Sequence, residues 1–217
     1  SNCSASTYGG AIHCANGTAT LKGSSISGCS ASTGGTFYLT GGTIKVTNKS
    51  VITGTNSYIN TAGSLIIDNS TYDYSGTGKA LWVSGDTDRK GKITVQNNSL
   101  VKTKGIGIYT HLGNTTFKDS DLIVEPTTVS GINCVGAYLY TGGIDTLSNA
   151  RIYNKNSGGY VFYCGTGNTS YTARMIINNG YFYATGNMAG TYNSNMEVLT
   201  HEFSCIIKSH PNRWLFM

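Results

Sequence analysis

The chain has few charged residues and no long apolar segment. Only 12% of its 217 residues are charged, and the net charge of +5 is spread along the sequence without a Lys/Arg cluster. Nucleic-acid-binding domains concentrate Lys and Arg in a patch, so we expect no nucleic-acid partner. No stretch approaches the roughly eighteen consecutive apolar residues of a membrane-spanning helix, so we expect no membrane insertion.

Metal-binding and redox motifs are also missing. The six cysteines form no Cys-x-x-Cys pair and show no zinc-ligand spacing. The four histidines are scattered along the chain, at His13, His111, His201 and His210. We therefore expect no metal and no cofactor, with the Asp86-Thr87-Asp88 segment as a loose Ca²⁺ candidate. No motif supports nucleophilic catalysis by a Cys/His pair.

What the sequence contains instead is a repeat, Gly-x-x-x-φ-x-Asn-x-x-φ, in which φ is apolar. The apolar anchor stands at Leu21, Val46, Ile67, Val95, Phe117, Leu147 and Ile177. Four residues before an anchor stands Gly17, Gly42, Gly63, Gly91, Gly113 or Gly143. Two residues after it stands Gly23, Asn48, Asn69, Asn97, Asp119, Asn149 or Asn179. Five residues after it stands Ile26, Val51, Tyr72, Leu100, Leu122, Ile152 or Phe182.

The spacing of this repeat predicts a β-solenoid. Successive anchors lie 21 to 30 residues apart, a range typical of solenoids. Apolar and polar residues alternate locally, as in Ile44-Lys45-Val46, which indicates strands. Asn, Asp and Gly tolerate a positive φ, so each copy is expected to turn one corner at the Asn-type column and another at the Gly column. We predict three short strands per coil and about seven to eight coils, a rod of roughly 35–40 Å.

The pattern resembles the right-handed parallel β-helix of the pectin-lyase-like proteins, in which an asparagine ladder marks one bend. The resemblance covers roughly residues 8 to 186 and implies an all-β, single-domain fold. It implies strand one at Ile12-His13-Cys14, strand two from Thr18 and strand three from Ser24. The phrase Gly9-Gly10-Ala11-Ile12 is similar to the repeats of adhesins such as the chlamydial polymorphic outer-membrane proteins, which are also β-helical.

Residues 1–186 are accordingly assigned to coils and residues 187–217 to an irregular C-terminal segment, a cap or an interface. Residues 186–195 are expected to form a loop and residues 205–208 a last strand. The chain begins inside a repeat-like phrase, so we expect a mature form, a fragment, or a subunit whose end is covered by a partner. Abundant Gly, Ser, Thr, Asn and Tyr favour an extracellular or cell-surface location.

Two pairs of cysteines occupy equivalent places in neighbouring copies of the repeat, Cys3 with Cys29 and Cys134 with Cys164. Stacked residues one coil apart have Cα atoms about 4.8 Å from each other, within the range of a disulfide. Both pairs are candidate disulfides if the protein is secreted, and the alternative is a ladder of buried free thiols.

The middle residue of each strand-one triplet is expected to point outward. These residues are His13, Tyr38, Ile59, Trp82, Tyr109, Tyr138 or Leu139, and Tyr163. Stacked rings stabilise neighbouring strands without any further role. They also suit the binding of sugar rings, or lateral packing against another rod, so the His, Tyr and Trp members are candidate ligand-binding residues.

The resemblance places a pectin-lyase-like active site on this face, walled by long third loops. Such enzymes use paired carboxylates, or Ca²⁺-binding acids with a Lys or Arg base. No outward strand-one position here is Asp, Glu, Lys or Arg, and most third loops are short. One alternative catalytic site combines Asp86, Asp88, Arg89 and His111 beside Trp82 and Tyr109, although a solvated charged loop is the favoured explanation of the 86–90 segment.

Two further acidic positions are expected to be structural. Asp119 should serve its corner with Asp121 beside it, and the inward-facing Asp145 should mark a local register shift rather than a buried charge.

The sequence thus favours a non-catalytic extracellular β-solenoid, an adhesin-like or structural module that binds glycans or partner proteins through its outward aromatic face. Two alternatives remain open. One is a polysaccharide-active lyase or glycoside hydrolase of the pectin-lyase-like class. The other is a filament-forming subunit that self-associates by stacking through uncapped ends.

Overall fold

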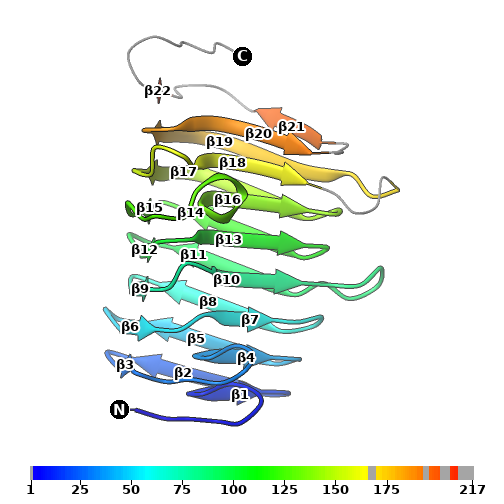
Figure 1. Cartoon of the computed structure of the whole chain (residues 1–217). Helices are drawn as coiled ribbons and strands as arrows, with labels where there is room; N and C mark the ends of the chain where they lie inside the picture. Colours follow the sequence, from blue (N-terminus) through cyan, green and yellow to red (C-terminus); the bar gives the residue numbers. More distant parts are fainter. Residues whose placement is uncertain (1, 166–169, 193–195, 201–205, 210–217) are drawn as a thin grey trace.

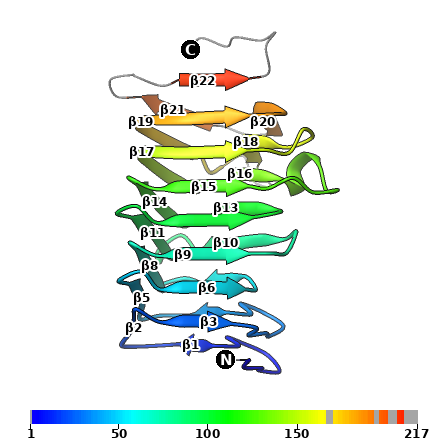
Figure 2. The same ribbon diagram turned by 90° about the vertical axis from the view of Figure 1, so that its left-hand side faces the viewer.

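The structure is a computed structural model that describes residues 2–165, 170–192, 196–200 and 206–209. These residues form an all-β parallel solenoid of about seven turns, which confirms the predicted fold class. Its coils are stacked in sequence order, as Figure 1 and the perpendicular view in Figure 2 show. Each coil contributes one strand to each of three parallel arrays.

The strand-one array is a sheet of eight strands: β1 (Ile12–Cys14), β4 (Phe37–Leu39), β7 (Ser57–Ile59), β10 (Lys79–Ser84), β13 (Ile106–His111), β16 (Val135–Tyr140), β18 (Tyr160–Gly165) and β20 (Asn187–Tyr192). The strand-two array contains β2 (Thr18–Lys22), β5 (Thr43–Thr47), β8 (Ser64–Asp68), β11 (Lys92–Gln96), β14 (Asn114–Lys118) and β21 (Met196–Thr200). The strand-three array contains β3 (Ser25–Ser27), β6 (Val51–Gly54), β9 (Thr71–Tyr74), β12 (Leu100–Thr103), β15 (Asp121–Val124) and β22 (Ile206–Ser209).

Two long strands, β17 (Ile144–Asn154) and β19 (Ala173–Ala184), run through a corner and belong to both of the last two arrays, which therefore form one 14-stranded sheet. The only helix in the described residues is a short 3₁₀ turn, η1 (Gly131–Asn133). It lies in the long third loop that precedes β16.

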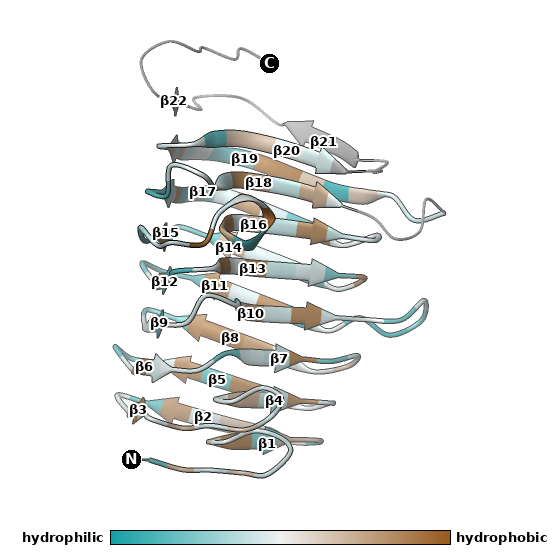
Figure 3. Cartoon of the chain, viewed as in Figure 1, coloured by the Kyte–Doolittle hydropathy of each residue, from teal (hydrophilic) through white to brown (hydrophobic). Residues whose placement is uncertain are grey.

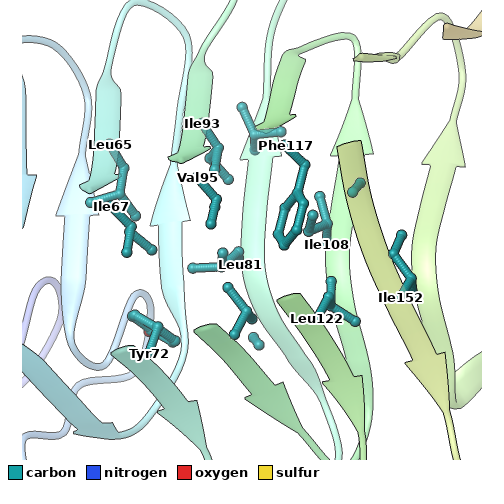
Figure 4. Close-up of a cluster of buried hydrophobic side chains, with 14 of the residues drawn as sticks. Leu65, Ile67, Tyr72, Leu81, Ile93, Val95, Ile108, Phe117, Leu122 and Ile152 are labelled. Carbon is teal, nitrogen blue, oxygen red and sulfur yellow. The ribbon is translucent and has the colours of Figure 1, made fainter. Parts of the chain in front are cut away.

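The apolar anchors form one continuous column inside the solenoid. Parallel pairing aligns all seven in register, from Leu21 to Ile177. Every anchor except the half-buried Leu21 is buried. Figure 4 shows Ile67, Val95 and Phe117 packed inside the coils, and Figure 3 shows apolar residues recurring along the strands from coil to coil. Each buried anchor side chain stabilises the fold by about 1.5–3 kcal/mol.

The Asn-type corner is confirmed in every copy. Gly23, Asn48, Asn69, Asn97, Asp119, Asn149 and Asn179 all have a positive φ, between 44° and 69°. Short polar side chains tolerate this left-handed conformation and can bond to their neighbours. In the last coils they do so directly, because the Asn179 amide donates to Asn149 and the Asn149 amide donates to Asp119, each over 2.8 Å.

A serine ladder lies next to this corner and sets the register of strand three. The backbone N–H groups of Ser24, Ser50, Ser70 and Ser99 each donate to the Oγ of the next serine, ending at Ser120, over 2.9–3.2 Å. This ladder was not predicted, although a serine follows the corner in five copies. Its buried hydroxyls give the turning backbone the partners that it would otherwise lack.

The serine ladder also explains one error in the predicted core. In coils two and four a second residue, Lys49 or Asn98, adopts a positive φ before the serine. Strand three therefore starts one residue later, and Ile52 and Val101 occupy the inward positions expected for Val51 and Leu100. Val51 itself is 41% exposed.

The glycine column works differently from the prediction. Only Gly17 and Gly42, with φ of 77° and 66°, have the expected left-handed conformation. At Gly63, Gly91, Gly113 and Gly143 the cause is close packing between coils. A Cβ on Gly63, for example, would lie 2.7 Å from that of Leu39, so the column has no room for a side chain there.

The solenoid continues beyond residue 186, contrary to the predicted boundary. The expected loop at 186–195 is wrong over β20, which pairs in parallel with β18 and extends the strand-one array. The half-buried Met188 packs against the core there. Strands β21 and β22 both pair with β19, and β22 lies where a last strand was expected. His201, Cys205, His210 and the segment 214–217, expected to act as a cap, lie outside the described residues.

The two predicted disulfides have different outcomes. Ser4 pairs with Ser30, so Cys3 and Cys29 are stacked as predicted, but Cys3 is an exposed free thiol. The pairing of Cys134 with Cys164 is wrong. Val135 is opposite Tyr160, whereas Cys164 is opposite Leu139 on β16. In one coil the extra residues lie before strand one, in the loop that precedes β16, and in the next coil they lie after strand one, β18. The two cysteines are therefore equally far from their anchors in sequence but stand at different positions relative to strand one.

Candidate functional site

The outward residues of the first seven strands of the strand-one array, β1 to β18, form an unbroken column of rings, which we call the aromatic ladder. Its members are His13, Tyr38, Tyr58, Trp82, Tyr109, Tyr138 and Tyr163, which parallel pairing aligns one above the other. Centroids of successive rings are 4.3–6.0 Å apart. Tyr8 adds a stacked ring over Tyr38, with centroids 4.3 Å apart.

All six predicted ring positions lie on this ladder, whereas the predicted outward residue Ile59 and the alternative Leu139 were wrong. Tyr58, not Ile59, is the outward residue of β7, and Ile59 is buried. The reason is Ser57, a polar residue at an inward position, whose Oγ lies 2.7 Å from the phenolic oxygen of the buried Tyr72. On β16 the outward residue is Tyr138 and not Leu139, which is buried.

The rings shield one another unevenly. Tyr38, Tyr109 and Tyr138 are buried by their neighbours, Tyr58, Trp82 and Tyr163 are half-buried, and His13 is exposed. Burial raises the pKa of Tyr138 to about 12 and also raises the pKa of Tyr109. These phenols are therefore neutral at physiological pH, so the ladder offers ring faces and edges with uncharged hydroxyl groups.

One cation lies at the centre of the ladder. The Nζ of Lys79 is 4.0 Å from the ring centroid of Trp82 and 3.6 Å from that of Tyr109, and burial lowers its pKa. His111 packs edge-on against Tyr140, and its pKa is lowered by burial and by the nearby Lys79 charge. The repeat did not mark Lys79, because it precedes the β10 triplet. Its contact with two rings is a cation–π interaction.

The charged segment after β10 folds into a hairpin that Asp86 closes. The backbone N–H of Asp86 donates to the carbonyl of Arg89, and its carboxylate accepts from the N–H groups of Asp88 and Arg89. These backbone bonds lower the pKa of Asp86, and the Arg89 guanidinium lies 3.2 Å from it. Asp86 therefore has a structural role in the turn.

The hairpin and the first corners of coils two and three line a shallow, open depression of about 630 Å³, which we call the hairpin depression. Its lining includes Asp88, Arg89, Lys90, Lys92 and Ser64, but none of Trp82, Tyr109 and His111. The residues of the alternative catalytic site thus divide between two places, with His111 at the ladder and Asp88 and Arg89 at the depression.

The remaining acidic candidates also have structural partners. Asp119 occupies its corner, as predicted, and Asp121 forms an ion pair with Arg151. Asp145 contradicts the expected register shift, because it stays in register with Thr115 on one side and Met175 on the other. It is fully buried, and burial raises its pKa to about 7.

No cluster of His, Cys, Asp and Glu side chains that could hold a metal is present among the described residues. In the same part of the chain, no helix combines the length and hydropathy needed to cross a bilayer. Comparisons with known protein families, with characterised proteins and with solved structures found no match for this chain. The candidate site therefore rests on the geometry of the solenoid itself.

Proposed function

We propose that this chain is a non-catalytic binding module and that its aromatic ladder is a docking face for polysaccharide. The observation that carries the proposal is the unbroken column of rings across seven coils. Rings that present an apolar face beside a polar edge suit the apolar faces and hydroxyl groups of sugars. A repeating column on a rigid array matches a ligand that itself repeats, and contacts along it add up.

Binding is favoured over catalysis by the chemistry of the same face. The strands of the strand-one array contain no Asp and no Glu. Glycoside hydrolysis needs two carboxyl groups about 5–9.5 Å apart across the scissile bond. Of the two candidate acids after β10, Asp86 is held in its turn and Asp88 lines the hairpin depression rather than the ladder. A lyase or hydrolase of the pectin-lyase-like class is therefore the less supported alternative.

We place the module outside the cell, as an adhesin-like rod. Its low charge content and polar Gly, Ser, Thr, Asn and Tyr surface support this location. Self-association through the ends of the solenoid stays a prediction.

Native electrophoresis in gels that contain different polysaccharides tests the proposal. We expect at least one polysaccharide to retard the wild-type protein and Trp82→Ala to weaken retention about tenfold or more, as for a central aromatic contact. Tyr153→Ala is the matched control, since Tyr153 points outward from the strand-three array and its ring packs at a tilt against that of Tyr181. Equal losses in both variants, or retention by no polysaccharide, would contradict the proposal.

A second readout separates binding from turnover. The retained polysaccharide is incubated with the protein, and newly formed chain ends are counted. We expect none above background. New ends that disappear in Asp88→Asn/His111→Gln would overturn the non-catalytic assignment.

A further inference from the structure

The hairpin depression has an excess of positive charge. Arg89, Lys90 and Lys92 line it together with a single carboxylate, that of Asp88. Asp86, which pairs with Arg89, is not part of the lining. Among the described residues, no ion pair involves Lys90 or Lys92. Two lysines are therefore free to meet an anion from solution.

The floor of the depression adds hydroxyl donors and leaves room for a ligand. Thr43, Ser64 and Lys92 are aligned on the adjacent strands β5, β8 and β11, at the start of each strand. Beside them the floor is formed by small residues, including Gly63, where a side chain cannot fit. The three hydrogen bonds of Asp86 hold the turn of the hairpin, and Lys92 begins strand β11. The backbone that carries these cations is therefore ordered beside the floor.

We propose that the hairpin depression binds a sulfate ester group of a polysaccharide, an inference that rests on the proposed function of the ladder. A sulfate group presents three oxygens and can accept from two ammonium groups and a hydroxyl together, whereas a carboxylate presents two. Both groups stay charged across the physiological pH range, so the number of oxygens distinguishes them. The ligand is accordingly a sulfated glycan that contacts both the ladder and the depression.

Three dextran derivatives with one backbone provide the probes: dextran sulfate, carboxymethyl dextran and unmodified dextran. Affinities are measured by calorimetry at an ionic strength of about 0.05 M, where surface charges are little screened. The test variant is Lys90→Gln/Lys92→Gln. The control is Lys22→Gln/Lys49→Gln, which removes the same charge from exposed lysines away from the depression. We expect the test variant to lose about tenfold or more in affinity for dextran sulfate and the control less than about threefold.

Equal losses in the two double variants would overturn the inference, since a diffuse positive field would then explain binding. Carboxymethyl dextran bound as tightly as dextran sulfate would overturn the preference for sulfate. Trp82→Ala separates the two proposals. A loss confined to the lysine variant would support the depression and contradict the ladder, while a loss confined to Trp82→Ala would support the ladder and contradict the depression.

Discussion

The buried carboxyl group of Asp145 should make the stability of the solenoid depend on pH. Asp145 is 0% exposed, and its Oδ1 accepts a 2.7 Å hydrogen bond from the Thr110 hydroxyl. That hydroxyl is in turn 2.9 Å from the Oγ1 of Thr115. The second oxygen, Oδ2, has no hydrogen-bond partner within the described part of the chain. An ionised carboxylate in this position would lack its hydration, so the neutral acid is favoured.

The magnitude follows from the proton affinities of the two states. In the unfolded chain the pKa is near its ordinary value of 3.8, and in the folded chain burial raises it to about 7. Below pH 3.8 both states hold the proton and the stability is at its highest. Between the two values the folded state alone keeps the proton, so stability falls by about 1.36 kcal/mol per pH unit. Above pH 7 the loss is complete, at about 4 kcal/mol, a large share of a typical unfolding free energy.

Urea unfolding of wild type and Asp145→Asn at several pH values between 4 and 8 measures this effect. The amide keeps the size of the side chain and does not titrate. We expect the variant to gain about 4 kcal/mol relative to wild type between pH 4 and pH 8. Asp73→Asn is the control, because Asp73 forms a surface ion pair with Lys102 and should change by less than about 1 kcal/mol. A wild-type to Asp145→Asn difference that stays constant with pH would refute the reasoning.

Three further tests concern the coil geometry, each read from urea unfolding. Gly63→Ala should lower the free energy of unfolding by about 1–3 kcal/mol, because a Cβ would lie 2.7 Å from the nearest side-chain atom. Gly17→Ala should lower it by about 1–2 kcal/mol because of the φ of 77° at that position. An unchanged free energy at either site would refute the cause given for it. Ser99→Ala should cost about 1–3 kcal/mol, since a buried N–H of the preceding coil loses its acceptor, and a neutral result would remove the serine ladder as a stabilising element. Ile52→Ala should cost about 2–5 kcal/mol and Val51→Ala less than about 0.5 kcal/mol, and the opposite order would contradict the register.

The repeat was sufficient to predict the fold because each of its columns has one physical cause. The anchors must be apolar to fill the interior, and the Asn-type corner needs residues that tolerate a positive φ. Both columns are therefore visible without coordinates. The errors in predicting the corners arose where two different structural requirements select the same residue type. Glycine serves a left-handed turn at Gly17 but close packing at Gly63, and the sequence does not distinguish them.

Register was the less predictable property, because polar residues can occupy inward positions when another strand supplies a partner. Ser57 bonds to Tyr72 of the strand-three array in the same coil, and Asp145 bonds to Thr110 from the preceding coil. A rule that expects apolar residues at inward positions and polar residues at outward ones assigns both residues to the wrong face of the strand. Insertions also shift the register, and the repeat length does not show where in a coil the insertion lies. The wrong pairing of Cys134 with Cys164 is an example.

The candidate site was predictable in part. The ladder followed from the triplets, so its members were found except Tyr58. The cation at its centre was not found, since the reach of Lys79 across Trp82 to Tyr109 depends on side-chain conformation. The hairpin depression could not be predicted either, because it joins residues 88–92 to two earlier coils.

The fluorescence of Trp82 tests the central claim, that the ladder is the binding face, most directly. Wild type and Trp82→Phe are titrated with the polysaccharide that retards the protein most, and the emission spectra are compared. Our account predicts a saturable change in the wild-type spectrum that is absent in Trp82→Phe, because the ligand covers the half-buried indole. A wild-type spectrum that stays unchanged at saturation, or a change that survives in Trp82→Phe, would contradict it.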